Sequence, residues 1–167
     1  MINEVPICDS LRSGHLNSGV AYFIQPSECS DDVIELRLVV NVGSLNENDD
    51  EQGLAHFVEH LGFKGTKSFE QYELVKVLQS LGLSYGADLN ASTHLLETKY
   101  TLCVTRSHED LSQLSLGINI LSEWAFHMTI KESDVVEEVC YCTLLFRFMI
   151  LDSFYVSNTN HVTLNPN

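Results

Sequence analysis

The sequence predicts an α+β fold in which helices pack on one face of an antiparallel or mixed β-sheet. One observation is the period of the apolar residues, which changes along the chain between the two-residue repeat of a strand and the wider repeat of a helix. A second is the order of the resulting elements: two strands, two helices, two strands and two helices. Strands that follow one another in pairs are typical of hairpins, so this order argues against a parallel, doubly wound sheet.

The first two strands are expected within residues 20–42. Residues 20–24 are a short apolar run after Asn17-Ser18-Gly19, a sequence typical of a strand that leaves a turn. Residues 33–42 alternate between apolar and polar side chains, which predicts a half-buried strand. Its apolar face comprises Ile34, Leu36, Leu38, Val40 and Val42.

Two helices are expected next, after an acidic loop at residues 46–52 whose negative charge favours a following helix N-terminus. The first helix covers Leu54–Leu61 and ends at Gly62. Residues 68–71, Ser-Phe-Glu-Gln, match a capping box, which predicts that the second helix starts there and continues through Leu81.

The second half of the chain repeats the pattern of two strands and two helices. Strands are expected around residues 83–93 and 95–104, followed by a long helix over about residues 109–126. A second capping box at residues 129–132 predicts the start of a last helix. The apolar stripe expected on the long helix comprises Leu111, Leu114, Ile118, Leu121 and Ala125.

Composition excludes several classes of protein. The 167 residues carry 23 Asp and Glu against 9 Lys and Arg, a formal net charge of −14, which excludes a nucleic-acid binder and a basic membrane-surface protein. No apolar run reaches the roughly 20 residues that span a bilayer, and residues 1–17 lack the pattern of a signal peptide. Five cysteines without framework spacing favour free thiols. We therefore expect an intracellular protein.

The strongest chemical signal is His56-Phe57-Val58-Glu59-His60. On a helix, residues four apart lie on one face, so the two imidazoles can meet one small cation. Neutral imidazole suits Zn²⁺, and zinc with an open position lowers the pKa of water toward about 7. The Glu59 carboxylate can take the proton of that water and pass it to a leaving amine. The motif therefore predicts metal-assisted hydrolysis.

The sequence around this motif carries a family pattern. Its segments are Leu38–Ser44, Asp49–His60, Phe63–Lys67, Asn90–Thr93, Glu97–Tyr100 and Ser122–Trp124. Together they resemble the pitrilysin/insulinase zinc metallopeptidases, in which His-x-x-Glu-His is the inverted zincin motif. The resemblance covers about residues 14–138 and implies the fold of the N-terminal part of a pitrilysin or mitochondrial-processing-peptidase-like metallohydrolase domain, in truncated form.

The resemblance also implies roles for individual residues. His56 and His60 are implied as zinc ligands, and Glu59 as the catalytic base. An edge strand is implied to pair with the backbone of a peptide or protein substrate, which grips an extended peptide whatever its side chains. The residues of that strand are Asn90, Ala91, Ser92 and Thr93. Intact members of the family enclose their substrates with other modules of a larger peptidase, which are the further partners implied.

The third zinc ligand is where the chain departs from the family pattern. Members supply a Glu from a later helix, the last residue of a stretch like E-R-x-V-V-x-E-E. If Val135-Val136 matches the paired valines, Glu138, or its neighbour Glu137, is the candidate ligand. If Ser122–Trp124 and residues 130–135 set the alignment instead, Glu138 is the first Glu of that stretch, and Leu145 occupies the ligand position. We favour the second alignment.

A change in composition supports that alignment. Residues 139–151 are almost entirely apolar, and only Arg147 and Asp152 are charged in residues 139–167. We therefore predict two regions, a partial metallopeptidase domain at residues 1–138 and a divergent apolar tail at residues 139–167. Such a tail is typical of a truncated or alternatively spliced product, or of a mispredicted gene end.

Two functions follow from these observations. The first is a zinc-dependent metalloendopeptidase module that hydrolyses peptide bonds through a metal-activated water. The alternative is a catalytically impaired peptidase homologue that acts as a peptide-binding or interaction fragment. With Leu145 in the ligand position, we expect weak zinc binding and little peptidase activity from the isolated chain.

Overall fold

The computed structural model describes residues 8–27, 33–70, 73–80, 83–84, 86, 88–105 and 110–139. The chain divides into two compact units, residues 1–32 and residues 33–167. Each unit is described by itself.

The first unit contains a β-hairpin formed by β1 (Arg12–His15) and β2 (Ala21–Ile24). The two strands pair antiparallel, with Arg12 opposite Ile24 and His15 opposite Ala21. Gly19 lies in the predicted turn with φ of 88°, a left-handed conformation that glycine adopts without steric cost. The sequence Arg-Ser-Gly-His of β1 has no apolar alternation, which is why only β2 was predicted.

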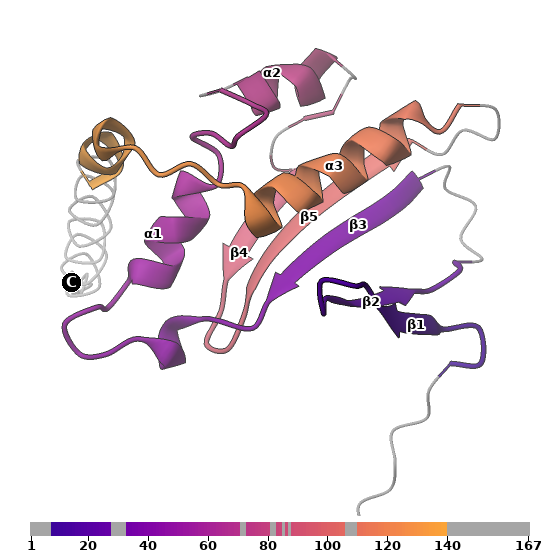
Figure 1. The fold of residues 1–167 in the computed structure, drawn as a ribbon, viewed down its shortest axis with the longest axis horizontal. Coiled ribbons are helices and arrows are strands. Elements are labelled where there is room, and N and C mark those ends of the chain that lie inside the picture. Colours follow the sequence, from indigo (N-terminus) through magenta and orange to yellow (C-terminus); the bar gives the residue numbers. More distant parts are fainter. Residues whose placement is uncertain are drawn as a thin grey trace, which may run out of the picture. The chain divides into compact units, whose positions relative to one another are not determined.

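The second unit is built on an antiparallel three-stranded sheet (Figure 1). Its strands are β3 (Val33–Val40), β4 (Leu89–Thr93) and β5 (Thr98–Thr105), in the spatial order β3-β5-β4. Tyr100 of the central strand β5 lies between Leu38 of β3 and Ala91 of β4. Among the described residues, strands β3 and β4 are therefore the two edges of this sheet.

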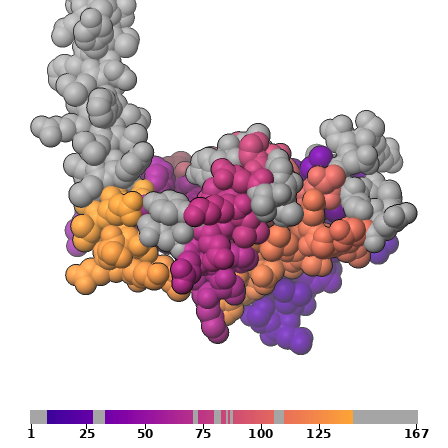
Figure 2. Space-filling view, turned by 90° about the horizontal axis from the view of Figure 1, so that it is seen from above, coloured from indigo at the N-terminus to yellow at the C-terminus, as the bar shows by residue number. Residues whose placement is uncertain are grey.

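Helices cover one face of this sheet. They are α1 (Leu54–Leu61), α2 (Glu73–Ser80) and α3 (Ser112–Phe126), and a further helical segment at residues 132–139 lies beside α1. In the space-filling view, α2 and the chain leading into it (magenta) lie between residues 132–139 (orange) and α3 (salmon) (Figure 2). None of the helices in the described ranges has the length and apolar character needed to cross a bilayer.

The core lies between the sheet and these helices. Its buried members come from β4, β5, α2, α3 and the segment before β4: Leu74, Leu78, Leu83, Leu89, Tyr100, Leu102, Val104, Ile120 and Trp124. Alternate residues of β5 are buried, which matches the period of two expected of a strand with one covered face. The α+β prediction, with helices on one face of the sheet, is confirmed, and the sheet is antiparallel.

The buried face of α3 differs from the predicted stripe. Leu111 precedes the helix and, like Ile118, is more than half exposed, whereas the buried residues of α3 are Gly117, Ile120, Glu123 and Trp124. A Cβ atom at position 117 would lie 2.5 Å from Leu36 Cδ1, so glycine allows the helix to approach β3 closely. The prediction was wrong for Leu111 and Ile118, because apolar periodicity does not detect a buried glycine or a buried carboxylate, whereas Leu121 does pack against the core.

Several predicted boundaries also differ. Helix α2 begins at Glu73 instead of Ser68, because the Ser68 amide and hydroxyl each donate a hydrogen bond of 2.9 Å to the carboxylate of Glu123. Burial raises the pKa of Glu123, but hydrogen bonds from Thr66 and Ser68 outweigh burial and hold its pKa below the ordinary value. Strand β3 ends at Val40, leaving Val42 outside the strand and exposed.

The predicted starts of a strand and of the last helix also shift toward the C-terminus. Strand β4 begins at Leu89, since Ser84 donates two hydrogen bonds to Asp88 and forms a turn before it. The last helix begins at residue 132, not at the predicted capping residue Thr129. The predicted apolar tail, residues 139–167, lies outside the described residues except for Val139.

Candidate metal centre

Helix α1 carries the His-x-x-Glu-His sequence, and an acidic side chain caps its N-terminus. The two carboxylate oxygens of Glu47 accept hydrogen bonds from the amides of Ala55 (2.7 Å) and Gly53 (2.8 Å). These bonds hold the pKa of Glu47 below its ordinary value. As predicted, the acidic loop places negative charge at the N-terminus of the helix, which is the positive end of the helix dipole.

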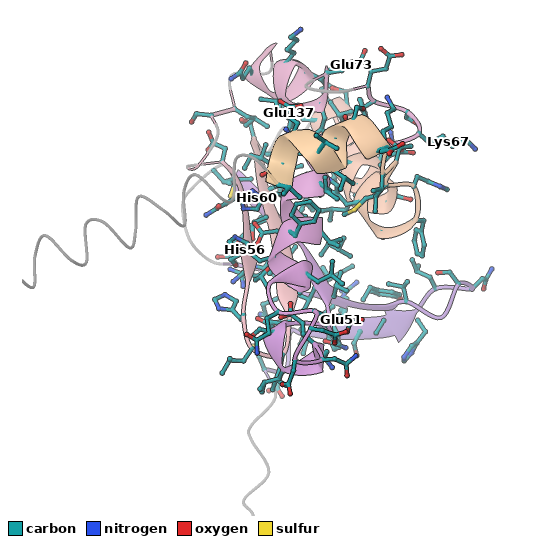
Figure 3. The ribbon with its side chains drawn as sticks, turned by 90° about the vertical axis from the view of Figure 1, so that its left-hand side faces the viewer. Glu51, His56, His60, Lys67, Glu73 and Glu137 are labelled. Atoms are coloured by element: carbon teal, nitrogen blue, oxygen red, sulfur yellow. The ribbon has the colours of Figure 1, made fainter. Side chains whose placement is uncertain are left out.

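The two histidines present their outer nitrogens to each other. His56 Nε2 and His60 Nε2 are 3.0 Å apart, and the ring centroids are 4.6 Å apart. Both side chains lie on the same side of α1, as the four-residue spacing predicts (Figure 3). His56 is exposed and His60 is half-buried, so this pair is open to solvent on one side.

The donor set fits a zinc ion. Zinc binds imidazole nitrogen at about 2.0–2.1 Å, and tetrahedral angles then set two such nitrogens ~3.3 Å apart. The observed 3.0 Å is close to that spacing. One ligand atom each from His56, Glu59 and His60 lie within 4.8 Å of one another, and no other such group of three occurs among the residues that the structure describes.

Glu59 is buried and held by the neighbouring strand. Its residue exposure is 7%, and its Oε2 accepts a 2.7 Å hydrogen bond from Thr93 Oγ1 of β4. The Thr98 hydroxyl, 3.4 Å from that of Thr93, donates instead to the carbonyl of Val42 at 2.9 Å. Thr93 therefore directs its single proton to Glu59.

Glu138 contacts His60 from the side opposite His56. Glu138 Oε1 lies 2.6 Å from His60 Nδ1, and Glu138 Oε2 lies 3.1 Å from Lys64 Nζ. Burial raises the pKa of Glu138, but the hydrogen bonds from His60 and Lys64 and their charges outweigh burial, so its pKa is lowered. A carboxylate that accepts the Nδ1 proton leaves the Nε2 lone pair of the imidazole for a metal.

The structure places two of the three residues considered for the position of the third zinc ligand, Glu137 and Glu138. Glu138 faces the inner nitrogen of His60, and neither it nor Glu137 belongs to the group formed by His56, Glu59 and His60. The Glu137 side chain is half exposed, with Oε1 3.5 Å from Lys64 Nζ. Leu145 lies outside the described residues.

The predicted substrate strand is an edge of the sheet. Asn90, Ala91, Ser92 and Thr93 lie in β4, which pairs with β5 on one side and contacts α1. The side chains of this strand differ in their partners. Asn90 Oδ1 accepts a hydrogen bond from the Ala91 amide, Ser92 Oγ lies 3.2 Å from His94 Nε2, and Thr93 contacts Glu59.

Aromatic packing supports α1 from the core. Tyr100 stacks on Trp124 with ring centroids 5.1 Å apart, and Trp124 Nε1 donates a 3.0 Å hydrogen bond to the Gly62 carbonyl at the end of α1. Burial, and then the negative charge of Glu59, raise the pKa of Tyr100 far above its ordinary value. Tyr100 is therefore a neutral core residue, not an acid or base of this site.

Two contacts of the site were not predicted from the sequence. The Lys64–Glu138 ion pair joins residues 74 positions apart, and the Thr93–Glu59 hydrogen bond joins residues 34 positions apart. Lys64 is 9% exposed, although it follows directly on the helix with the motif. A lysine in a stretch that is otherwise apolar or small, Leu61–Thr66, is the signal that could have indicated a buried ion pair.

The sequence pattern of the family described as insulinase (peptidase family M16) matches residues 18–144 of the chain. The probable zinc protease PqqL of Escherichia coli is 36% identical over 135 residues, which are 80% of this chain and 14% of that protein. The probable zinc protease PqqL of Haemophilus influenzae is 32% identical over 133 residues, with the same two shares. The chain thus spans about one seventh of the length of these relatives.

A solved structure shares the fold. The crystal structure of the periplasmic protease PqqL from Escherichia coli superposes with a TM-score of 0.79 at 34% identity. The superposition covers 86% of this chain and 16% of that one.

Proposed function

Because the chain belongs to the insulinase family of peptidases (peptidase family M16), we propose that it is the zinc-binding part of a metalloendopeptidase. One observation carries the proposal: His56 Nε2 and His60 Nε2 converge to 3.0 Å beside a buried Glu59. His56 and His60 hold the metal, and Glu59 is the catalytic base. Zinc bound there supplies a Lewis acid that activates water and polarises the peptide carbonyl.

Three further side-chain roles are proposed, for Glu138, Glu59 and Thr93. Glu138 accepts the Nδ1 proton of His60 and so keeps the Nε2 lone pair directed at the cation. Glu59 accepts the proton of the attacking water and delivers it to the leaving amine. The Thr93 hydroxyl donates a hydrogen bond to Oε2 of Glu59 and so fixes the orientation of that carboxylate.

Strand β4 is the proposed substrate site, at residues Asn90 to Thr93. Within the part of the chain that the structure describes, β4 pairs with a strand on one side only, so its other edge offers backbone amides and carbonyls to an extended peptide, which would add to the sheet as a further strand. The position of β4 against α1 supports this proposal, because a peptide bound along the strand lies beside the helix that carries Glu59.

The Thr93 hydroxyl is expected to contribute to stability. Replacing Thr93 by valine keeps the shape of the side chain and leaves the buried Glu59 oxygen without its donor, which should lower the free energy of unfolding by about 1–3 kcal/mol. Urea unfolding of the variant measures the change. Serine at position 93 keeps the hydroxyl and should recover most of the loss, and the Thr93→Val effect should shrink in a Glu59→Leu background, which has no oxygen to accept the hydrogen bond. Equal stability of Thr93→Val and the parent would contradict the contact.

A peptide-binding fragment with impaired catalysis is the second candidate function. It is favoured by the position of Glu138, which faces His60 Nδ1 and leaves two imidazoles as the nitrogen donors of the described site. Leu145 in the position of the third ligand would have the same consequence. In this case β4 would still bind extended peptides.

Hydrolysis of a fluorescence-quenched extended peptide tests the two candidates. The parent chain and a His60→Ala variant are compared in buffered zinc, with binding of an uncleaved peptide followed by fluorescence anisotropy. Hydrolysis by the parent that exceeds the rate of the variant supports the metallopeptidase. Equal rates with retained binding support the second candidate, and equal rates without binding contradict both.

A further inference from the structure

Lys64 is a buried lysine at the end of the helix that carries the metal site. It follows α1 by three residues, is 9% exposed, and places Nζ 3.1 Å from Glu138 Oε2 and 3.5 Å from Glu137 Oε1. A buried ammonium is costly unless it is paired, so the ion pair with Glu138 determines where this side chain can lie. Lys64 thereby joins α1 to the helical segment at residues 132–139.

The two oxygens of Glu138 have different partners. Oε2 contacts Lys64, and Oε1 lies 2.6 Å from His60 Nδ1. A carboxylate can turn about its last bond, and an ion pair to one oxygen restricts that rotation. With Oε2 fixed by Lys64, Oε1 stays on the imidazole, and His60 Nε2 stays directed at His56 Nε2, 3.0 Å away.

We infer that Lys64 is a positioning residue of the metal centre, which acts through Glu138 on the orientation of His60. The inference rests on the proposed function, since it concerns the same zinc site. Lys64 is neither one of the proposed metal ligands nor part of the proposed substrate strand. The three side chains form a chain of contacts in which Lys64 contacts Glu138 and Glu138 contacts His60.

The sign of the effect on zinc affinity separates this role from simple electrostatics. Lys64 is a positive charge near a cation site, so by repulsion alone its removal should tighten zinc binding. A positioning role predicts the opposite, because the partners of a metal-bound histidine typically change metal affinity by about 10- to 100-fold. A weaker zinc affinity after loss of a positive charge is therefore the specific signature of positioning.

Zinc affinity of the full chain, measured by competition with a chromophoric chelator, tests the inference. Lys64→Met should weaken zinc binding by about 10-fold, and Lys64→Gln should do the same if the methionine variant folds poorly. Lys64→Arg keeps the charge and the donors and should stay within about 3-fold of the parent. Lys67→Met is the matched control and should leave the affinity unchanged, since Lys67 is exposed and lies away from His56 and His60 (Figure 3).

The coupling to Glu138 is tested in a double variant. Glu138→Leu offers no oxygen to either partner, so Lys64→Met in that background should weaken zinc binding no further. Further weakening by the same factor as in the parent background would show that Lys64 acts on folding or by another route, and would overturn the inference. So would unchanged or tighter zinc binding by Lys64→Met alone.

The same titration distinguishes the inference from the proposed function. Zinc binding that depends on His60 but not on Lys64 leaves the metal site standing and removes only the role of Lys64. Zinc binding that is the same in the parent and in His60→Ala contradicts the metal site, and the inference fails with it.

Discussion

Replacing Glu59 by glutamine is expected to leave zinc on the chain and to reduce peptide hydrolysis by at least about 100-fold. Glutamine has the size of glutamate and can still accept the Thr93 hydrogen bond, so the geometry around the helix should persist. It has no negative charge and cannot take a proton from water. The variant therefore removes the base and little else.

The measurement pairs zinc content with hydrolysis on the same samples. The rate is taken above that of His60→Ala, so that hydrolysis independent of the metal is subtracted. Glu51→Gln is the control for the loss of one carboxylate, because Glu51 is exposed in the loop before α1, away from His60 (Figure 3). Hydrolysis by Glu59→Gln at the parent rate would show that Glu59 is not the base.

Replacing either His56 or His60 by alanine is expected to weaken zinc affinity by more than about 100-fold. Each imidazole supplies one of the two nitrogens that converge at 3.0 Å, and a single remaining imidazole is a poor site for zinc. Chelator competition measures the affinity of each variant, and thermal unfolding without metal shows whether the fold persists.

His15→Ala is the matched control for the loss of a histidine. His15 is an exposed residue of β1 in the other unit of the chain, so its removal should leave zinc affinity unchanged. If either histidine of the motif could be removed with as little effect as His15, the metal centre would have to lie elsewhere.

The elements that bear the site were predicted well because their signals are local. The acidic loop, the apolar period and Gly62 predict α1 with the bounds that the structure has, Leu54–Leu61. Alternation predicts β3 and β5 to within a few residues. The four-residue spacing of His56 and His60 predicts their common face, because helix geometry alone fixes it.

The remaining parts of the site depend on contacts between distant segments. Whether Glu138 faces the metal side or the Nδ1 side of His60 is decided by how residues 132–139 pack against α1 and by the ion pair with Lys64. The same holds for Thr93, which was predicted only as part of the substrate strand and whose hydroxyl donates a hydrogen bond to Glu59, 34 positions earlier in the chain. Ser68 does not cap α2, because its amide and hydroxyl donate hydrogen bonds to Glu123, which is also distant in the sequence.

X-ray absorption at the zinc edge of the zinc-loaded chain tests the central claim most directly, since it reports the ligand atoms themselves. The site described here predicts a first shell of nitrogen and oxygen with imidazole nitrogens at about 2.0–2.1 Å, and the imidazole signal should fall in His60→Ala. A first shell dominated by sulfur at about 2.3 Å would place the metal on cysteines instead. Such a spectrum, or one unchanged by His60→Ala, would contradict the account.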